Sequence, residues 1–253
     1  MRPALNTLIL TSLLPIVACT GDESMPSPPS SSFAPPSPAS SVTPSSGVSP
    51  TPTMTPDILP PGVPATYDRD VAPEQLPREE LVPEGALTDD LQILEGGPVA
   101  ITWVLGVDPL RSEHGLVIWR RRPGENPPWV ATYAIREPPS AGVLGIRMTR
   151  TDQDLTGDGQ ADILFLEGLG GSGACAIWGV VQLTPQHDDR IFRRQLCDAN
   201  VDPLLTEPGI RIQASVYRPG DPHCCPSEER RTDLAWTDSR WRTLSTEVTD
   251  LSG

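Results

Sequence analysis

The sequence predicts an all-β domain, built as an antiparallel meander, a sandwich or a partial propeller, behind a disordered stalk. Two observations carry this prediction. Beyond about residue 97, short runs rich in β-branched and aromatic residues recur with turn signals roughly every ten to fifteen residues. Before about residue 66, the chain is dominated by Pro, Ser and Thr, a composition that buries too little apolar surface to fold.

The N-terminus has the pattern of a secretory signal peptide. Residues 1–18, "MRPALNTLILTSLLPIVA", carry one charge, at Arg2, followed by an apolar core too short to span a bilayer. Ile16, Val17, Ala18 and Cys19 resemble the lipobox of bacterial lipoproteins. The resemblance implies an acylated Cys19 that anchors the exported chain to a lipid bilayer, at the cell surface or in the periplasm. The alternative is an ordinary cleaved signal with a chance cysteine.

The segment 19–66 is predicted to be a disordered linker. From about residue 23 it is Pro, Ser and Thr with almost no large apolar residue. Proline at this density favours the polyproline II conformation, which makes the segment a semi-rigid stalk. The Ser and Thr content also allows an O-glycosylated stalk.

Within the predicted β domain, residues 67–253, the segment 84–94 has the pattern of one short helix, and ten later segments have strand patterning. The strand candidates are 99–106, 115–122, 129–137, 143–151, 161–168, 175–183, 190–197, 210–217, 232–238 and 240–248. All six tryptophans fall inside these candidates, so we expect them in the core. The alternative is an exposed pair that stacks on carbohydrate.

Four cysteines remain if Cys19 carries lipid, an even number that indicates disulfides in an exported domain. Pairing Leu183 with Arg190 in a hairpin places Cys175 and Cys197 one position out of register. They would bond after a small shift of the strand register. In the preferred connectivity, however, "PHCCP" crosses the open end of the hairpin, and Cys224 and Cys225 each bond to one of the two hairpin cysteines. A zinc site that adds His223 is the competing interpretation.

The segment "DLTGDGQADILF" places oxygen donors at alternate positions of a glycine-containing loop: Asp154, Thr156, Asp158, Gln160 and Asp162. Calcium prefers six to eight hard oxygen ligands, and such a loop supplies them. The segment resembles the aspartate-rich loops of FG-GAP and VCBS-type β-repeats. That resemblance implies a structural calcium, although Thr156 replaces Asp or Asn and Phe165 replaces the EF-hand glutamate. The alternative is a plain Asx turn, which we expect not to need Asp162.

The formal net charge of −14 argues against nucleic-acid binding, which requires clustered positive charge. No catalytic motif is recognisable, and paired acids such as Asp188–Asp189 are interpreted as solvated turns. The sequence therefore favours a cell-envelope lipoprotein whose β domain binds or scaffolds an unidentified envelope or extracellular ligand without catalysis. The alternative is a secreted hydrolase, with two carboxylates ~5–10 Å apart in a cleft.

Overall fold

The computed structural model describes residues 59–108, 110–171, 174–185, 187–222 and 224–251. The signal segment, the lipobox, Cys19 and the linker up to residue 58 lie outside the described residues, as does His223. The described chain forms three antiparallel sheets and three single-turn 3-10 helices, so the predicted all-β class is confirmed.

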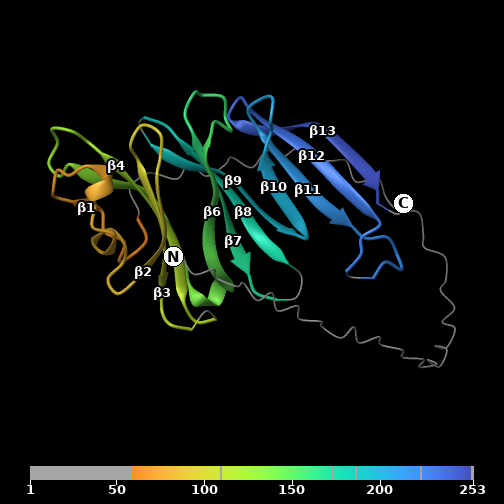
Figure 1. The fold of residues 1–253 in the computed structure, drawn as a ribbon, viewed down its shortest axis with the longest axis horizontal. Helices are drawn as coiled ribbons and strands as arrows, with labels where there is room; N and C mark the ends of the chain where they lie inside the picture. The colour runs from red at the N-terminus through yellow and green to blue at the C-terminus, as the bar shows by residue number, and fades with distance from the viewer. Residues whose placement is uncertain (1–58, 109, 172–173, 186, 223, 252–253) are drawn as a thin grey trace, which may run out of the picture. The chain divides into compact units, whose positions relative to one another are not determined.

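The first sheet has five strands in the order β1-β5-β4-β3-β2 (Figure 1). Their bounds are β1 Thr66–Tyr67, β2 Leu87–Ile93, β3 Val99–Leu105, β4 Glu113–Arg121 and β5 Trp129–Glu137. The segment before β2 contains the helices η1 (Pro73–Gln75) and η2 (Arg78–Glu80), and it packs against one face of this sheet. The indole N–H groups of Trp119 and Trp129 donate to the carbonyls of Leu81 and Val71, at 3.1 and 3.2 Å. The outer face of the first sheet is therefore covered by its own N-terminal segment.

The second and third sheets are four-stranded meanders, ordered β6-β7-β8-β9 and β10-β11-β12-β13. A third single-turn helix, η3 (Pro139–Ala141), leads from β5 into the second sheet. The strands are β6 Val143–Gln153, β7 Asp162–Leu169, β8 Cys175–Leu183, β9 Asp188–Cys197, β10 Ala199–Pro203, β11 Ile210–Val216, β12 Glu228–Thr237 and β13 Arg240–Asp250.

The second sheet is buried on both faces, because β7 alternates two apolar sets. Ile163 and Phe165 belong to the core shared with β4 and β5 of the first sheet. Leu164 belongs to the core shared with β10, β11 and β12 of the third sheet. Successive side chains of a strand point to opposite faces, so one strand supplies both cores. The three meanders therefore stack face to face, with the second sheet in the middle.

One predicted element is wrong, and one strand of the third sheet was missed. The segment 84–94, predicted to form one short helix, contains the edge strand β2, which pairs with β3. Pairing with the edge of an existing sheet overrides the local pattern here. The short strand β10 was not predicted, because it contains Asn, Asp and a terminal Pro203 that only an edge strand tolerates. Across the described ranges, no helix is long and apolar enough to cross a membrane.

Candidate functional site

The aspartate loop lies between β6 and β7, and Asp154 organises its first turn. The Asp154 carboxylate accepts hydrogen bonds from the backbone amides of Thr156 (3.2 Å), Gly157 (2.6 Å) and Gly159 (2.8 Å). Both glycines have left-handed φ values, 81° and 86°, which allow the chain to curl around this carboxylate. The first turn is thus an Asx-type turn, in which the Asp154 side chain accepts the backbone amides of the loop.

Asp162 joins this loop to the neighbouring hairpin. Its side chain is fully buried, and its two oxygens accept the amides of Leu155 (2.9 Å) and Leu183 (3.2 Å). Leu183 is the last residue of β8, so one carboxylate fixes the loop to the end of a strand in the same sheet. The expectation that a plain turn does not need Asp162 is therefore wrong, because the buried amides of Leu155 and Leu183 need this acceptor.

Burial raises the pKa of Asp162 from 3.8 to about 7. The amides of Leu183 and Leu155 oppose this shift, the carboxylate of Asp158 adds to it, and the hydroxyl of Thr156 opposes it. The groups that stabilise the ionised form are thus neutral dipoles, while the charge of the Asp158 carboxylate disfavours it. A bound cation would favour the ionised form of Asp162.

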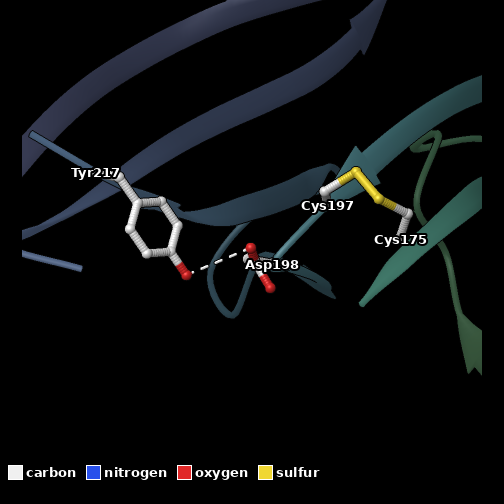
Figure 2. The surroundings of a disulfide bond; sticks show 4 residues. All are labelled: Cys175, Cys197, Asp198 and Tyr217. Carbon is white, nitrogen blue, oxygen red and sulfur yellow. Dashed lines mark hydrogen bonds between the residues drawn. A yellow bond between two sulfur atoms is a disulfide. The ribbon is translucent and has the colours of Figure 1, made fainter. Parts of the chain in front are cut away.

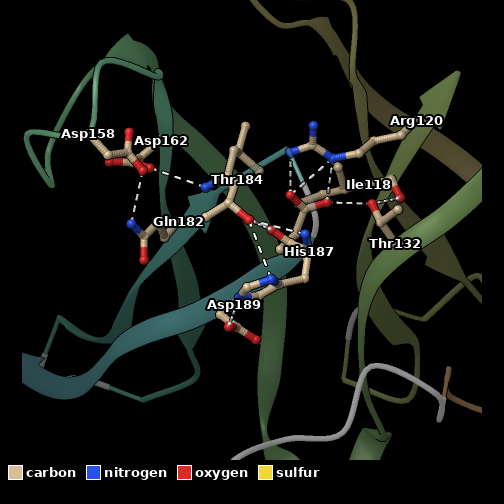
Figure 3. Close-up of polar contacts among 11 residues, drawn as sticks. Ile118, Arg120, Thr132, Asp158, Asp162, Gln182, Thr184, His187 and Asp189 are labelled. Carbon is tan, nitrogen blue, oxygen red and sulfur yellow. Dashed lines mark hydrogen bonds and ion pairs between the residues drawn. The ribbon is translucent and has the colours of Figure 1, made fainter. Parts of the chain in front are cut away.

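Asp158 lies at the exposed side of the loop and faces Gln182 of β8 (Figure 3). Its Oδ1 accepts the amide of Gln160 at 2.9 Å, and its Oδ2 accepts the Gln182 side-chain amide at 2.9 Å. Thr156 Oγ1 accepts the same Gln182 amide at 3.5 Å. The structure therefore brings the predicted donors Asp154, Thr156, Asp158 and Asp162 into one loop, where internal hydrogen bonds hold their oxygens.

The donor set has the hard oxygen chemistry that calcium prefers, and a carboxylate oxygen that accepts one amide keeps a further lone pair. However, in the part of the chain that the structure describes, no three His, Cys, Asp or Glu side chains converge in a metal-binding geometry. Calcium at Asp154, Thr156, Asp158, Gln160 and Asp162 therefore stays a prediction.

Asp188, at the start of β9, links the second sheet to the first. Its side chain is fully buried, and its Oδ1 lies 2.5 Å from Arg120 Nη2 of β4, while Oδ2 accepts the hydroxyl of Thr132 of β5 (Figure 3). The neighbouring Asp189 is half-exposed and lies 2.9 Å from His187 Nε2. The interpretation of Asp188 as a solvated turn residue is wrong. Its pairing with Leu183, whose side chain faces the first sheet, places Asp188 on the same face.

A second buried ionic group lies between the same two sheets. Glu167 of β7 follows Ile163 and Phe165 on the face toward the first sheet, and its side chain is fully buried. Its carboxylate lies 3.4 Å from Arg193 and 3.9 Å from Arg190, and Arg193 lies 3.9 Å from Glu137 of β5. Burial, then the charge of Glu137, raises the pKa of Glu167, while the two arginines lower it. Sequence reasoning missed this group, because position 167 of an alternating strand predicts an apolar residue.

The tryptophans divide into two sets. Trp103, Trp119, Trp129 and Trp178 are buried, as the core interpretation predicted. Trp236 and Trp241 are half-buried neighbours across β12 and β13, with ring centroids 5.3 Å apart. Trp241 also donates to the Ile191 carbonyl at 3.0 Å, and its ring meets Phe192 edge-on at 5.7 Å. Trp241 therefore extends the core between the second and third sheets, and Trp236 packs beside it.

The hairpin β8–β9 carries a disulfide between Cys175 and Cys197 (Figure 2). The predicted connectivity, in which Cys224 and Cys225 each pair with a hairpin cysteine, is wrong. Leu183 pairs with Asp188 rather than with Arg190, and an irregularity at Val180 and Val181 shifts the register again. Cys175 therefore lies directly opposite Cys197. Cys224 and Cys225 are exposed and form no disulfide in the structure.

Comparison with known proteins provides no assignment for this arrangement. No protein-family model, no curated protein and no solved structure matches the chain.

Proposed function

We propose that the chain is an exported lipoprotein of the cell envelope, and that its β domain is a non-catalytic binding or scaffolding module. Residues 1–18 supply the export signal, and Cys19 in its lipobox-like setting supplies the anchor. The Cys175–Cys197 disulfide supports an oxidising compartment, because disulfides persist mainly outside the cytoplasm. The stalk then separates the β domain from the bilayer.

The observation that carries the scaffolding role is the ionic connection between the first two sheets. Asp188 of the second sheet pairs with Arg120 of the first, and Arg193 of the second sheet, which lies beside the buried Glu167, is 3.9 Å from Glu137 of the first. Charged groups in this setting lose their partners when the sheets separate, so they disfavour sliding or opening of the stack. A rigid stack that presents its loops and edge strands suits binding better than a mobile active-site cleft does.

Glu137 and Glu167 form one carboxylate pair to weigh for the alternative, a hydrolase. These two share Arg193, and Glu167 is closed off between two sheets rather than facing a cleft. A surface hollow is lined by Gln92 and by residues 148–152 of β6, where Asp152 is the acidic residue. A pair of accessible carboxylates is what retaining and inverting glycosidases require, so these two places support binding over hydrolysis.

We further propose that calcium stabilises the aspartate loop. Asp162 is a buried carboxylate beside Asp158, and a divalent cation between the two would offset both their repulsion and the burial of Asp162. Asp154, Thr156 and Gln160 would complete an all-oxygen set. The ion has a structural role in this proposal, since it would lie where the loop meets the end of β8.

In-cell photo-crosslinking tests the proposed function. A photoreactive amino acid at Leu205, exposed in the β10–β11 loop, or at Glu247 of the exposed edge strand β13, samples two separate surfaces. We expect a discrete envelope partner from at least one surface, and the same probe at the buried Leu164 should give none. The absence of a discrete partner from both surfaces would contradict the binding role, and hydrolytic activity of the purified domain that Glu167→Gln abolishes would favour the hydrolase instead.

A further inference from the structure

The loop between β11 and β12 holds two adjacent cysteines with their sulfur atoms in contact. Cys224 Sγ and Cys225 Sγ lie 2.6 Å apart, and both residues are exposed. Cys175 is bonded to Cys197, so Cys224 and Cys225 are the two cysteines of the described residues that form no disulfide. The pair lies between Pro222 and Pro226, whose rings fix the backbone φ on both sides.

Asp221 and Arg218 fix the loop that carries this pair. The Asp221 carboxylate accepts the amide of Arg218 (2.7 Å), the amide of Ser227 (3.0 Å) and the hydroxyl of Ser227 (2.5 Å). The Arg218 guanidinium lies 2.5 Å from Glu228 of β12 and 3.0 Å from Asp250 of β13. Both ends of the loop are thus fixed to strand ends, and the two thiols are held at its exposed tip.

Tyr217 places this tip beside the hairpin disulfide. Its hydroxyl donates to Asp198 Oδ2 at 3.3 Å, and Asp198 directly follows Cys197 (Figure 2). The pKa of Tyr217 is raised by burial, then by Asp198, and also by the charges of Cys224 and Cys225. The loop that carries the two thiols thus begins at Tyr217, whose hydroxyl reaches the residue next to the Cys175–Cys197 bond.

We propose that Cys224 and Cys225 form a redox-active dithiol, which low-molecular-weight disulfides such as oxidised glutathione convert into a disulfide between adjacent residues. The ring that closes contains eight atoms and is strained by its size, and strained, exposed disulfides are the readily reversible ones. The site therefore takes disulfides and thiols as its ligands. It goes beyond binding or scaffolding and does not depend on the lipid anchor.

The exchange proceeds in two steps. The Cys224 thiolate attacks one sulfur of oxidised glutathione, forms a mixed disulfide and releases the first glutathione thiolate. The Cys225 thiol then loses its proton and attacks Cys224 Sγ, which forms the Cys224–Cys225 bond and releases a second glutathione thiolate. Two electrons pass from the cysteine pair to glutathione, and the two thiol protons end on the two released glutathione molecules. The hydrogen bond with Cys224 raises the pKa of Cys225, which is consistent with Cys225 acting second.

Peptide mapping of the purified full-length chain tests this assignment. The chain is reduced with dithiothreitol, treated with oxidised glutathione, quenched with an alkylating reagent and digested without reductant. We expect the peptide that contains both cysteines to lose two hydrogen atoms and to carry no glutathione and no alkyl group. Cys225→Ser should instead retain one glutathione on Cys224, because the second step lacks its nucleophile.

The double variant Cys175→Ser/Cys197→Ser is the matched control, and it should leave the product at Cys224–Cys225 unchanged. Persistent glutathione on the wild-type pair would contradict the proposal. So would a bond from Cys224 or Cys225 to Cys175, to Cys197 or to a second copy of the chain. None of these outcomes depends on export, so the result is separable from that of the proposed function.

Discussion

The buried carboxylate of Asp162 makes the stability of the domain depend on pH. The folded state holds its proton up to about pH 7, whereas the unfolded chain releases it near 3.8. Between these values the folded state binds more protons, so this group stabilises the fold fully below about pH 4 and progressively less as the pH rises toward 7. We expect Asp162 to lower the free energy of unfolding by up to a few kcal/mol over that interval.

Denaturant unfolding from pH 4 to pH 8 measures this dependence. Asp162→Asn should remove the contribution of this group, and it should also lower stability at every pH by about 1–3 kcal/mol, because one of two buried amides loses its acceptor. Asp189→Asn, at a half-exposed position, should retain the wild-type slope. An Asp162→Asn variant with the wild-type slope would show that Asp162 titrates normally.

Calcium should act on the same residue in the opposite sense, because it favours the ionised carboxylate. With a dissociation constant of about 10⁻⁴ to 10⁻³ M, as in extracellular modules, millimolar calcium adds ~0.4–1.4 kcal/mol. We expect a rise of a few degrees in the melting temperature at pH 8, a smaller rise at pH 5, little effect of magnesium and none in Asp158→Ala. If adding calcium to chelator-treated protein does not change the melting temperature, the loop is a plain turn.

At the scale of the strand, the core between the first two sheets depends on one glycine opposite an aromatic ring. Gly179 of β8 pairs with Phe165 of β7, and a Cβ atom at Gly179 would lie 2.3 Å from Phe165 Cζ. Gly179→Ala therefore displaces a buried ring, which costs ~1–3 kcal/mol. Gly145→Ala in β6 is the matched control, because nothing lies within 4 Å of its added Cβ. Equal melting temperatures for the two variants would contradict this packing.

Runs rich in β-branched and aromatic residues, bounded by turn signals, were sufficient to predict most strands. The segment 161–168 predicted β7 because its apolar residues form a nearly continuous run, and both faces of that strand are buried. The edge strands β2 and β10 could not be predicted in the same way. They form because they pair with β3 and β11, and their own residue patterns do not indicate a strand.

The candidate site was predictable in part. The aspartate spacing located the loop, but the role of Asp162 depends on Leu183, which is 21 residues further along the chain. The hairpin register depended on the irregularity at Val180 and Val181, which no sequence rule locates. The buried Asp188 and Glu167 were missed for a related reason. Stacking of two sheets brings Arg120 to Asp188, whereas the strand order β7-β8-β9 within one sheet brings Arg193 to Glu167.

At the scale of the whole molecule, the pairing of Asp188 with Arg120 connects two sheets. Asp188→Ala leaves Arg120 without its carboxylate where its side chain is only 17% exposed, and loss of one partner of a buried pair costs ~3–5 kcal/mol. Asp189→Ala, which removes a half-exposed carboxylate one residue along, should cost less than ~1 kcal/mol. Thermal unfolding compares the two variants. Similar losses would show that Asp188 does not connect the sheets.

The proposed anchoring of the domain depends on Cys19, and acyl labelling with membrane fractionation tests it most directly. A clickable palmitate analogue is fed to cells that express the wild-type chain or Cys19→Ala, and membranes are then separated from soluble protein. We expect label and membrane association in the wild type, and neither in the variant, because an apolar segment as short as residues 1–18 does not hold a chain in a bilayer. Label that persists in Cys19→Ala, or an unlabelled wild-type chain, would contradict the lipoprotein assignment.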